Sequence, residues 1–319
     1  MKQILIALLL FSPVLSDQDS LNVMFWNLEN FFDYKNDSTS VSDADFSSRG
    51  ARHWTGKRFY AKCNAVAKGV LWASAKKGAL PDVIGLAEIE NAFVLRRLLQ
   101  TTVLRKLDYR IVHYDSPDRR GIDVALLYRS SRLQLLSSKP CHLYKADSTI
   151  MLTRDILVTT FLEADGDTTA FLVNHHPSKF GGAAASAARR TIAVERLKRL
   201  ADSLQLLGIQ KIIAMGDFND TPANPVYHNL KPALWNKAEP FYKKGDGTIK
   251  YAGKWELIDM FFVSRPLLQN SQMDILYIPF LQTPDKAATG TKPLRTYSGP
   301  RYLGGVSDHC PVWLLVEPK

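Results

Sequence analysis

Residues 215–220, Met-Gly-Asp-Phe-Asn-Asp, combine a carboxylate with a carboxamide two positions apart. They follow the apolar run 212–214, which is typical of a buried strand that ends where its loop begins. Because successive side chains of a strand point to opposite faces, Asp217 and Asn219 are expected on one face. Such a pair can orient a water molecule, accept its proton and donate to a developing oxyanion. A turn or a helix cap, common roles of Asp and Asn, is the alternative.

Other apolar runs of the chain end in polar side chains in the same way. These polar residues are Asn27 and Glu29 after 21–26, Glu88 after 82–87, Asn174 and His175 where 169–174 ends, Asp259 within 257–263, and Asp308 and His309 before 312–316. A carboxylate inside an apolar strand, such as Asp259, needs a partner because burying it alone is unfavourable. Strand ends on one rim of a layered α/β domain converge, so this recurrence predicts a single site.

The oxygen-bearing members of this set suit a hard, hydrated cation such as Mg²⁺ or Mn²⁺, whereas Zn²⁺ favours more His or Cys. These members are Asn27, Glu29, Glu88 and Asp308. Asp259 with His309 forms the kind of pair that keeps an imidazole charged and oriented beside an anion. A simple turn is the alternative for residues 308–309, and a lone histidine such as His175 is more often structural than catalytic.

The apolar periodicity predicts the helices and strands that would position these side chains. Helical spacing covers residues 57–75, 91–104 and 186–207, and Gly78 and Gly208 are typical stop signals. Further strands are expected at 109–114, 122–128, 133–137 and 156–163. Residues 35–52 are expected to form an exposed loop, and 222–256 show little periodicity. The run 82–87 is apolar on both faces, which is typical of a central strand.

Two basic segments lie beside this framework. Arg119-Arg120-Gly121 precedes the strand at 122–128, where Arg120 could contact a phosphate or belong to a solvated turn. The second segment, 283–305, contains Lys286, Lys292, Arg295, Tyr297, Arg301 and Tyr302. Basic residues mixed with aromatic ones suit a nucleotide-bearing substrate, although a long polar loop often has this composition. The net charge of +10 fits an anionic partner such as nucleic acid or a phosphorylated headgroup, with simple solubility as the alternative.

Residues 1–16 differ from the rest of the 319-residue chain, whose 46% hydrophobic and 23% charged residues are typical of a globular protein. Lys2, a short apolar run and small residues up to Ser16 predict a cleavable secretory signal peptide. The segment is too short, and too broken by Pro13, to span a bilayer comfortably. A buried first strand is the alternative. Cleavage would remove one charge, Lys2, so that +10 becomes +9.

A signal peptide predicts a secreted or periplasmic protein without a stable membrane anchor. The end of the segment has no cysteine for lipid attachment. The three cysteines, at 63, 141 and 310, show no metal-binding spacing and permit at most one disulfide, whose pairing the sequence leaves open.

In combination, the motifs resemble the endonuclease/exonuclease/phosphatase superfamily, which includes the DNase I-like and exonuclease III-like nucleases. In the order that the family has them, the motifs are Trp26-Asn27-Leu28-Glu29-Asn30, Gly85-Leu86-Ala87-Glu88, Asn174-His175, Gly216-Asp217-Phe218-Asn219, Ile258-Asp259 and Ser307-Asp308-His309. The resemblance covers residues 17–319 as a single domain, and His53-Trp54-Thr55 is similar to the secreted bacterial branch. It implies an α/β fold: a four-layer sandwich with two mixed β-sheets face to face and helices outside.

The resemblance implies a divalent metal ion, Mg²⁺ or Mn²⁺, and ligands for it. Glu88 would hold the ion with Asn27 and Glu29, and Asp308 would assist. An ion of this kind supplies charge neutralisation for an in-line attack of water on phosphorus.

The resemblance also implies catalytic roles for the remaining polar residues. Asp217 would orient and deprotonate the attacking water, and Asn219 would assist it. His309, polarised by Asp259, would stabilise the charge that the scissile phosphate gains, and His175 would do so from the other side. These roles fit phosphodiester hydrolysis, which needs positioning and charge stabilisation more than covalent help.

The implied activity is metal-dependent hydrolysis of phosphodiester bonds, with nucleic acid as the expected substrate and Arg120 and Asn174 as contacts to it. A monomer is expected, and no obligate protein partner is implied. Sphingomyelinases and inositol polyphosphate phosphatases share the catalytic set, so these phosphoesterases remain alternatives. The phosphatase signature Trp-Cys-Asp-Arg is absent before Asp259. A non-catalytic binding module is a third possibility, disfavoured because no catalytic position is lost.

Overall fold

Two six-stranded mixed β-sheets pack face to face in the computed structural model, which describes residues 20–36, 40, 42–179 and 182–318. The first sheet contains, in spatial order, β13 (Ser271–Ile275), β18 (Val312–Val316), β1 (Leu21–Phe31), β2 (Val83–Ile89), β4 (Asp123–Arg129) and β3 (Tyr109–His113). The second sheet contains β5 (Leu133–Cys141), β6 (Ile156–Glu163), β7 (Thr168–His175), β8 (Lys211–Asp217), β12 (Asp259–Val263) and β9 (Trp235–Asn236).

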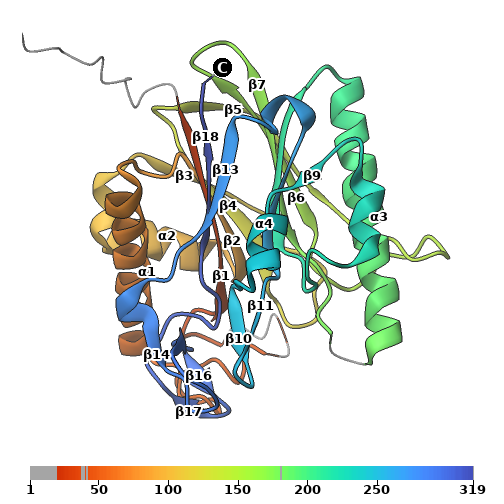
Figure 1. Ribbon diagram of the computed structural model, residues 1–319. Helices are drawn as coiled ribbons and strands as arrows, with labels where there is room; N and C mark the ends of the chain where they lie inside the picture. The colour runs from red at the N-terminus through yellow and green to blue at the C-terminus, as the bar shows by residue number, and fades with distance from the viewer. Residues whose placement is uncertain (1–19, 37–39, 41, 180–181, 319) are drawn as a thin grey trace, which may run out of the picture.

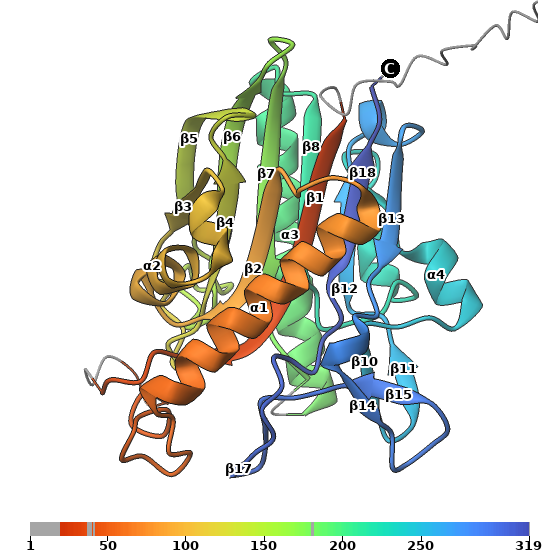
Figure 2. The same cartoon turned by 90° about the vertical axis from the view of Figure 1, so that its left-hand side faces the viewer.

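Helices cover the two outer faces of this pair of sheets. Helices α1 (Gly56–Lys77) and α2 (Ala92–Thr101) lie on the first sheet, and α3 (Ala183–Leu206) lies on the second (Figure 1 and Figure 2). The four-layer α/β sandwich expected from the sequence is thereby confirmed.

Smaller elements fill the connections. They are α4 (Glu239–Lys244) and the hairpins β10 (Ile249–Tyr251) with β11 (Lys254–Glu256), β14 (Gln282–Pro284) with β15 (Thr291–Pro293), and β16 (Tyr297–Ser298) with β17 (Arg301–Tyr302). Residues 222–256, where the sequence shows little periodicity, contain β9, α4, β10 and β11. Each of these elements is too short to produce a periodic pattern.

The helix boundaries follow from local capping. Helix α1 begins where the Thr55 side chain accepts a hydrogen bond from the backbone N–H of Arg58, and it ends at Gly78, whose φ of 78° is left-handed. The helix expected over 91–104 starts as predicted after Asn91 but stops at Thr101. Thr102 adopts an extended conformation and caps a separate 3₁₀ turn, Val103–Lys106.

The strand directions gather the polar strand ends at one end of the sandwich. Strand β1 runs parallel to β2, and β7 runs parallel to β8. These strands end where their antiparallel neighbours β4, β12 and β18 begin (Figure 1). There the register places Asp217 between His175 and Asp259. At the opposite end Leu21 pairs with Val316, so the start of β1 and the finish of β18 lie together.

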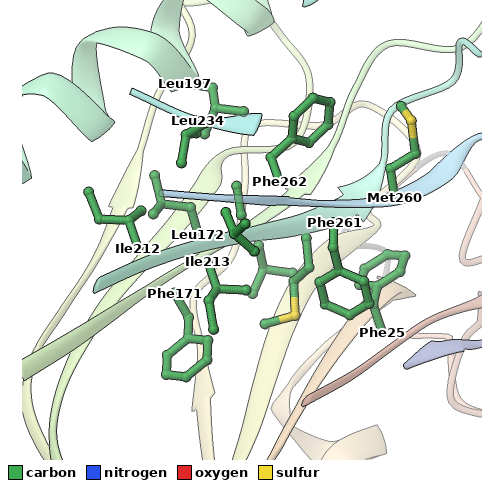
Figure 3. Packing of buried hydrophobic residues seen from close by; sticks show 14 of the residues in the cluster. Phe25, Phe171, Leu172, Leu197, Ile212, Ile213, Leu234, Met260, Phe261 and Phe262 are labelled. Carbon is green, nitrogen blue, oxygen red and sulfur yellow. The ribbon is translucent and has the colours of Figure 1, made fainter. Parts of the chain in front are cut away.

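The core between the sheets depends on strict alternation of side chains. Figure 3 shows Phe261 of β12 pointing toward Phe25 of β1, while the next residue, Phe262, points to the other side of its sheet. A Cβ atom at Gly85 of β2 would lie 2.7 Å from the sulfur of Met215 on β8. Glycine therefore lets the two sheets approach at this point, just inside the end that carries the polar residues.

The signal peptide predicted for residues 1–16 lies outside the described residues. Within the part of the chain that the structure describes, none of the helices has the length and apolar character needed to cross a bilayer. The three cysteines, Cys63, Cys141 and Cys310, are all buried and carry free thiols.

Candidate active site

Asp217 stands at the centre of the polar end of the sandwich. It is the last residue of β8 and is only 2% exposed. Its Oδ2 accepts a hydrogen bond from Nδ2 of Asn27 at 3.0 Å and lies 3.5 Å from Nε2 of His175 and 3.8 Å from Nε2 of His309. Side chains from both sheets therefore converge on one carboxylate oxygen. This agrees with the expectation that the polar strand ends meet at a single site.

The buried position of Asp217 changes its acidity. Burial raises the pKa of Asp217 to about 7, although the positive charge of His309 opposes the shift, and the negative charge of Asp259 adds to it. The other carboxylate oxygen, Oδ1, accepts the backbone N–H of Asn219 at 2.9 Å. A carboxylate that exchanges its proton near neutral pH has the acidity that a general base needs.

His309 and Asp259 form a buried ion pair beside Asp217. The Nδ1 atom of His309 lies 2.8 Å from Oδ2 of Asp259. Burial disfavours the imidazolium, but the attraction and hydrogen bond of Asp259, with the charge of Asp217, raise the pKa of His309 well above its usual value. His309 is thus a cation whose Nε2 faces the central carboxylate.

Backbone contacts hold this pair in place. The indole Nε1 of Trp26 donates to the carbonyl of His309 at 3.0 Å, and the Ser307 hydroxyl accepts the His309 N–H at 2.9 Å. The hydroxyl of Thr248, a fully buried residue, accepts the N–H groups of Ile258 and Asp259 at 3.3 and 3.2 Å. The Thr248 carbonyl accepts the N–H of Cys310 at 2.7 Å. Thr248 therefore links the two segments that supply the ion pair.

His175 differs from His309 in charge. Burial and the nearby positive charges of Arg154 and Arg120 hold the pKa of His175 well below its usual value, so the imidazole is neutral. Its Nε2 lies 4.0 Å from Oε1 of Glu88. Its Nδ1 is buried and has no hydrogen-bond partner among the described residues. A buried polar atom without a partner is uncommon in folded proteins.

Glu88 reaches the site through an irregular backbone. The residue has a φ of 62° and sits where the pairing of β2 with β4 shifts register. Its Oε2 accepts the backbone N–H of Asn30 at 2.7 Å and lies 3.5 Å from the Arg120 guanidinium. Although burial favours the neutral acid, attraction by Arg120 and the Asn30 hydrogen bond hold the pKa of Glu88 below its usual value. Glu88 is therefore an ionised carboxylate beside His175.

Left-handed backbone is concentrated at this end of the sheets. Besides Glu88, the residues with positive φ include Glu29 (44°), Asn30 (49°) and Asn219 (52°). A left-handed conformation costs a residue other than glycine about 1 kcal/mol or more. Residues with such a backbone cluster at functional sites. The strain re-aims side chains away from the strict alternation that the sequence pattern assumes.

Glu29 is directed to a neighbouring cluster rather than to Asp217. Its two carboxylate oxygens accept from Nε of Arg295 at 3.0 Å and from the backbone N–H of Thr296 at 2.9 Å. Nη2 of the same arginine lies 3.1 Å from Oδ2 of Asp308, whose Oδ1 is 3.8 Å from Nε2 of His309. Of the four predicted metal ligands, Asn27 and Glu88 adjoin the central carboxylate and its histidine, while Glu29 and Asp308 meet through Arg295.

Asn174 faces the opposite side of β7 from His175. Its Nδ2 donates to the backbone carbonyls of Leu172 at 2.9 Å and Met215 at 3.3 Å, and it is fully buried. A Cβ atom at Gly216 would lie 2.7 Å from Cβ of Asn174, so the two positions are closely packed. The structure does not bring Asn174 into contact with the residues around Asp217.

Arg154 is a site residue that sequence reasoning did not find. It is 6% exposed, its Nη1 lies 3.1 Å from Oδ2 of Asp118, and its Nη2 donates to the carbonyl of His176 at 2.6 Å. That carbonyl also accepts Nδ2 of Asn219 at 2.9 Å, so Arg154 and Asn219 share one anchor. Arg154 lies just before β6 and belongs to no recognisable sequence motif. The tertiary fold brings it near His175, so the local sequence does not indicate their proximity.

The donor set suits a divalent metal ion. Asp217, Asp259 and His309 can each bring one atom within 4.8 Å of the others, but His309 as an imidazolium has no lone pair for a metal, so the two carboxylates remain as donors. Glu88 adds an ionised carboxylate and Asn27 a carboxamide oxygen, and the excess of oxygen donors favours a hard cation over Zn²⁺. The residues present therefore fit Mg²⁺ or Mn²⁺.

Comparisons with known proteins agree with this architecture. A family model described as Endonuclease/Exonuclease/phosphatase family matches residues 22–318. No curated protein matches the chain.

Solved structures with the same fold share little sequence with the chain. One is an endonuclease/exonuclease/phosphatase family protein from Bacteroides thetaiotaomicron, with 19% identity, a TM-score of 0.58, and coverage of 94% of this chain and 98% of the other. Truncated TDP2 from Caenorhabditis elegans has 14% identity, a TM-score of 0.61 and the same coverage. TDP2 from D. rerio, complexed with single-strand DNA product, has 14% identity, a TM-score of 0.55, and coverage of 94% and 99%.

Proposed function

The chain belongs to the endonuclease/exonuclease/phosphatase family, and we propose that it is a divalent-metal-dependent phosphodiesterase that hydrolyses nucleic acid. The observation that carries this proposal is the convergence of Asn27, His175 and His309 on Oδ2 of Asp217. A carboxylate with a pKa of about 7, a neutral imidazole and an imidazolium are thereby held together. These are the groups that an in-line attack of water on a phosphodiester uses.

In the proposed reaction Asp217 orients the water and accepts its proton. The backbone N–H of Asn219 fixes Oδ1, which leaves Oδ2 as the oxygen that faces the other site residues. Asn219 is itself held by the His176 carbonyl and assists by keeping the carboxylate in position. Attack on phosphorus places additional negative charge on the phosphoryl oxygens.

The two histidines stabilise that charge in different ways. His309, a cation held by Asp259 at 2.8 Å, supplies a full positive charge. His175 is neutral and supplies a hydrogen bond from an imidazole whose Nδ1 lacks a partner among the described residues. A pre-organised cation and donor do not have to reorganise as the reaction proceeds, which is the source of their effect.

A bound Mg²⁺ or Mn²⁺ would polarise the scissile phosphate and neutralise its charge. Glu88 is the best supported ligand, because its ionised carboxylate adjoins His175 and is oriented by Asn30. Asn27 is the second proposed ligand, whereas Glu29 and Asp308 are paired with Arg295 and would join the set only by releasing that arginine. A loss of activity in EDTA that added Mg²⁺ restores would support this assignment.

Nucleic acid is the proposed substrate because the chain carries a net charge of +10 and because the DNA complex of D. rerio TDP2 has the same fold. Arg120, whose side chain is 43% exposed and whose guanidinium lies 3.5 Å from Glu88, is the proposed phosphate contact. Asn174, the second substrate contact expected from the sequence, is fully buried with its amide bonded to backbone carbonyls, so the proposal rests on Arg120. We further propose a secreted or periplasmic monomer, released from residues 1–16 and without a membrane anchor.

A panel of substrates tests the proposal. The mature chain is incubated with DNA, RNA, sphingomyelin and an inositol phosphate, each with Mg²⁺, Mn²⁺ or EDTA. Asp217→Asn is compared with Asp202→Asn, the same change at a 41% exposed position on α3. Metal-dependent cleavage of nucleic acid that only Asp217→Asn abolishes would support the proposal. Cleavage of a lipid or inositol phosphate alone would overturn the substrate, and silence on all four would favour a binding module.

A further inference from the structure

Arg295 lies between β15 and β16, within the basic segment 283–305 that the sequence distinguishes. Its side chain is 49% exposed, yet Nε donates to Oε1 of Glu29 at 3.0 Å and Nη2 lies 3.1 Å from Oδ2 of Asp308. These contacts use two of the five N–H donors of a guanidinium. The other donors have no partner among the described residues and can contact an anion that approaches the site.

The loop around Arg295 is rigidly mounted. The next residue, Thr296, donates its N–H to Glu29 at 2.9 Å, and its hydroxyl accepts from the buried ammonium of Lys62 at 2.9 Å. The Arg295 carbonyl accepts the N–H of Gly305 at 3.1 Å, and a Cβ at Gly305 would lie only 1.8 Å from the carbonyl oxygen of Leu294. A cation fixed in this way loses little conformational freedom when it binds a ligand.

Aromatic stacking on bases does not explain the loop. Tyr297 is 4% exposed, and its ring packs at 5.9 Å from Trp54 and 5.4 Å from Tyr302. Its hydroxyl donates to the carbonyl of Arg52 at 3.0 Å. These rings join loop segments to each other, so the part of this loop that remains available for recognition is its positive charge.

A row of contacts joins Arg295 to the proposed catalytic residues. In order of contact its members are Arg120, Glu88, His175, Asp217, His309, Asp308 and Arg295, and the nearest nitrogen and oxygen atoms of successive members lie 3.5, 4.0, 3.5, 3.8, 3.8 and 3.1 Å apart. The first and last members are arginines whose side chains are about half exposed. A substrate with a single phosphate has no second anion for the second arginine, whereas a nucleic-acid strand carries a phosphate on every nucleotide.

We infer that Arg295 is a specificity-determining residue that binds a phosphate flanking the scissile one and thereby selects a polynucleotide strand over a single-phosphate diester. The inference rests on the proposed function, because it assigns the reacting phosphate to the centre of the row. A guanidinium forms charge-assisted, bidentate contacts with phosphate, which makes it suited to this task.

Hydrolysis kinetics separate this role from a structural one. Arg295→Ala, Arg295→Lys and the control Arg301→Ala, an exposed arginine in the adjacent β17, are assayed on a single-stranded oligonucleotide and on bis(4-nitrophenyl) phosphate. Arg295→Ala should raise KM for the oligonucleotide about tenfold with kcat nearly kept, and should leave the small diester unaffected. Arg295→Lys should recover part of the loss and Arg301→Ala should show none. An equal loss on both substrates would overturn the inference.

Binding provides a readout that does not need catalysis. A fluorescent oligonucleotide is titrated in EDTA at several salt concentrations. The slope of log affinity against log salt should fall by about one in Arg295→Ala and stay unchanged in Arg301→Ala. An unchanged slope in Arg295→Ala, or no binding by the unmodified chain, would overturn the inference. Arg295-dependent binding without hydrolysis of either substrate would instead contradict the proposed function and leave the phosphate contact intact.

Discussion

Asp217 and Glu29 lie at the same end of the sandwich, and burial raises the pKa of each carboxyl to about 7. Around Asp217 the partners are the carboxamide of Asn27 and two imidazoles, one neutral and one charged. The groups around Oδ2 of Asp217 can thus give up their contacts with it when a water molecule binds there.

The surroundings of Glu29 are of another kind. Arg295 and the backbone N–H of Thr296 occupy its two oxygens, and the ammonium of Lys62 donates to its carbonyl at 2.6 Å. Burial lowers the pKa of Lys62 to about 8, with the charge of Glu29 opposing the shift. These partners fasten β1, α1 and the loop before β16 to one another.

The comparison shows that a pKa near neutrality identifies a carboxyl group as a candidate functional residue. The hydrogen-bond and charge partners of that carboxyl group then determine its role. The Glu29 carboxylate is held by a guanidinium and joins separate segments, so it acts as an anchor. The Asp217 carboxylate also accepts two hydrogen bonds, but its Oδ2 faces two histidines, so it is able to take part in chemistry. The following variants test this distinction.

The largest effect is expected from Asp217→Asn, which keeps the size of the side chain and removes the base. We expect kcat for DNA hydrolysis to fall by about 10³-fold or more, with the melting temperature nearly unchanged. Glu29→Gln should reduce kcat by less than about tenfold in the same assay, because an amide can keep part of the anchoring contacts. A loss in Glu29→Gln as large as that in Asp217→Asn would show that Glu29 is a catalytic ligand.

Lys62→Met should affect stability more than chemistry. Removing the buried ammonium leaves the Glu29 carbonyl and the Thr296 hydroxyl without their donor, and we expect a loss of about 3 kcal/mol in the free energy of unfolding. Denaturant titration measures it. Lys68→Met, an exposed lysine on the same helix, is the control and should change little. A stability loss below about 1 kcal/mol would mean that Lys62 is not an anchor.

Asp259→Asn should lower kcat by about 100-fold, because the partner of the His309 cation loses its charge. The folded-state pKa of His309 is raised, so the pair stabilises the fold below pH 6.5, and this contribution is lost as pH rises through the folded-state value. In Asp259→Asn the His309 ring should therefore titrate at a lower pH, which NMR can follow in EDTA. An unchanged His309 titration would refute the pairing.

The smallest effect concerns the pH dependence of stability at Glu29. Its pKa is raised from 4.5 to about 7 on folding, so the folded state binds the proton more tightly and loses stability as pH rises through this window. Glu29→Gln cannot lose that proton. The melting temperature of the variant, relative to the unmodified chain in EDTA, should rise by a few degrees between pH 4.5 and pH 7. A difference that stays constant with pH would contradict the shift.

Much of this architecture could be predicted because it follows from regular alternation. The apolar runs before Glu88, His175 and Asp217 are strands, and their parallel pairs bring the polar ends together. The pairing of Asp259 with His309 could also be anticipated, because a carboxylate in an apolar strand requires a partner.

The remaining features depend on irregular backbone and on distant loops. Asn27 and Glu29 diverge although they are two residues apart in β1, because Glu29 has a positive φ. Asn174 faces away from His175 because β7 keeps its alternation to the end. Thr248 reaches Ile258 and Asp259 across a short hairpin and Cys310 across a longer stretch of chain. The positions of Glu29 and Thr248 leave no periodic signal, whereas the orientation of Asn174 follows from regular alternation.

The pairing of Leu21 with Val316 places the start of β1 and the end of β18 at the opposite end of the sandwich from Asp217 (Figure 1). A linker attached near either residue would emerge on the far side from Asp217. The chain could therefore be immobilised on a bead, or joined to another domain, with its reactive end facing the solution. The same proximity makes the two positions suitable for a short bridging peptide, and new chain ends could then be opened in a surface loop.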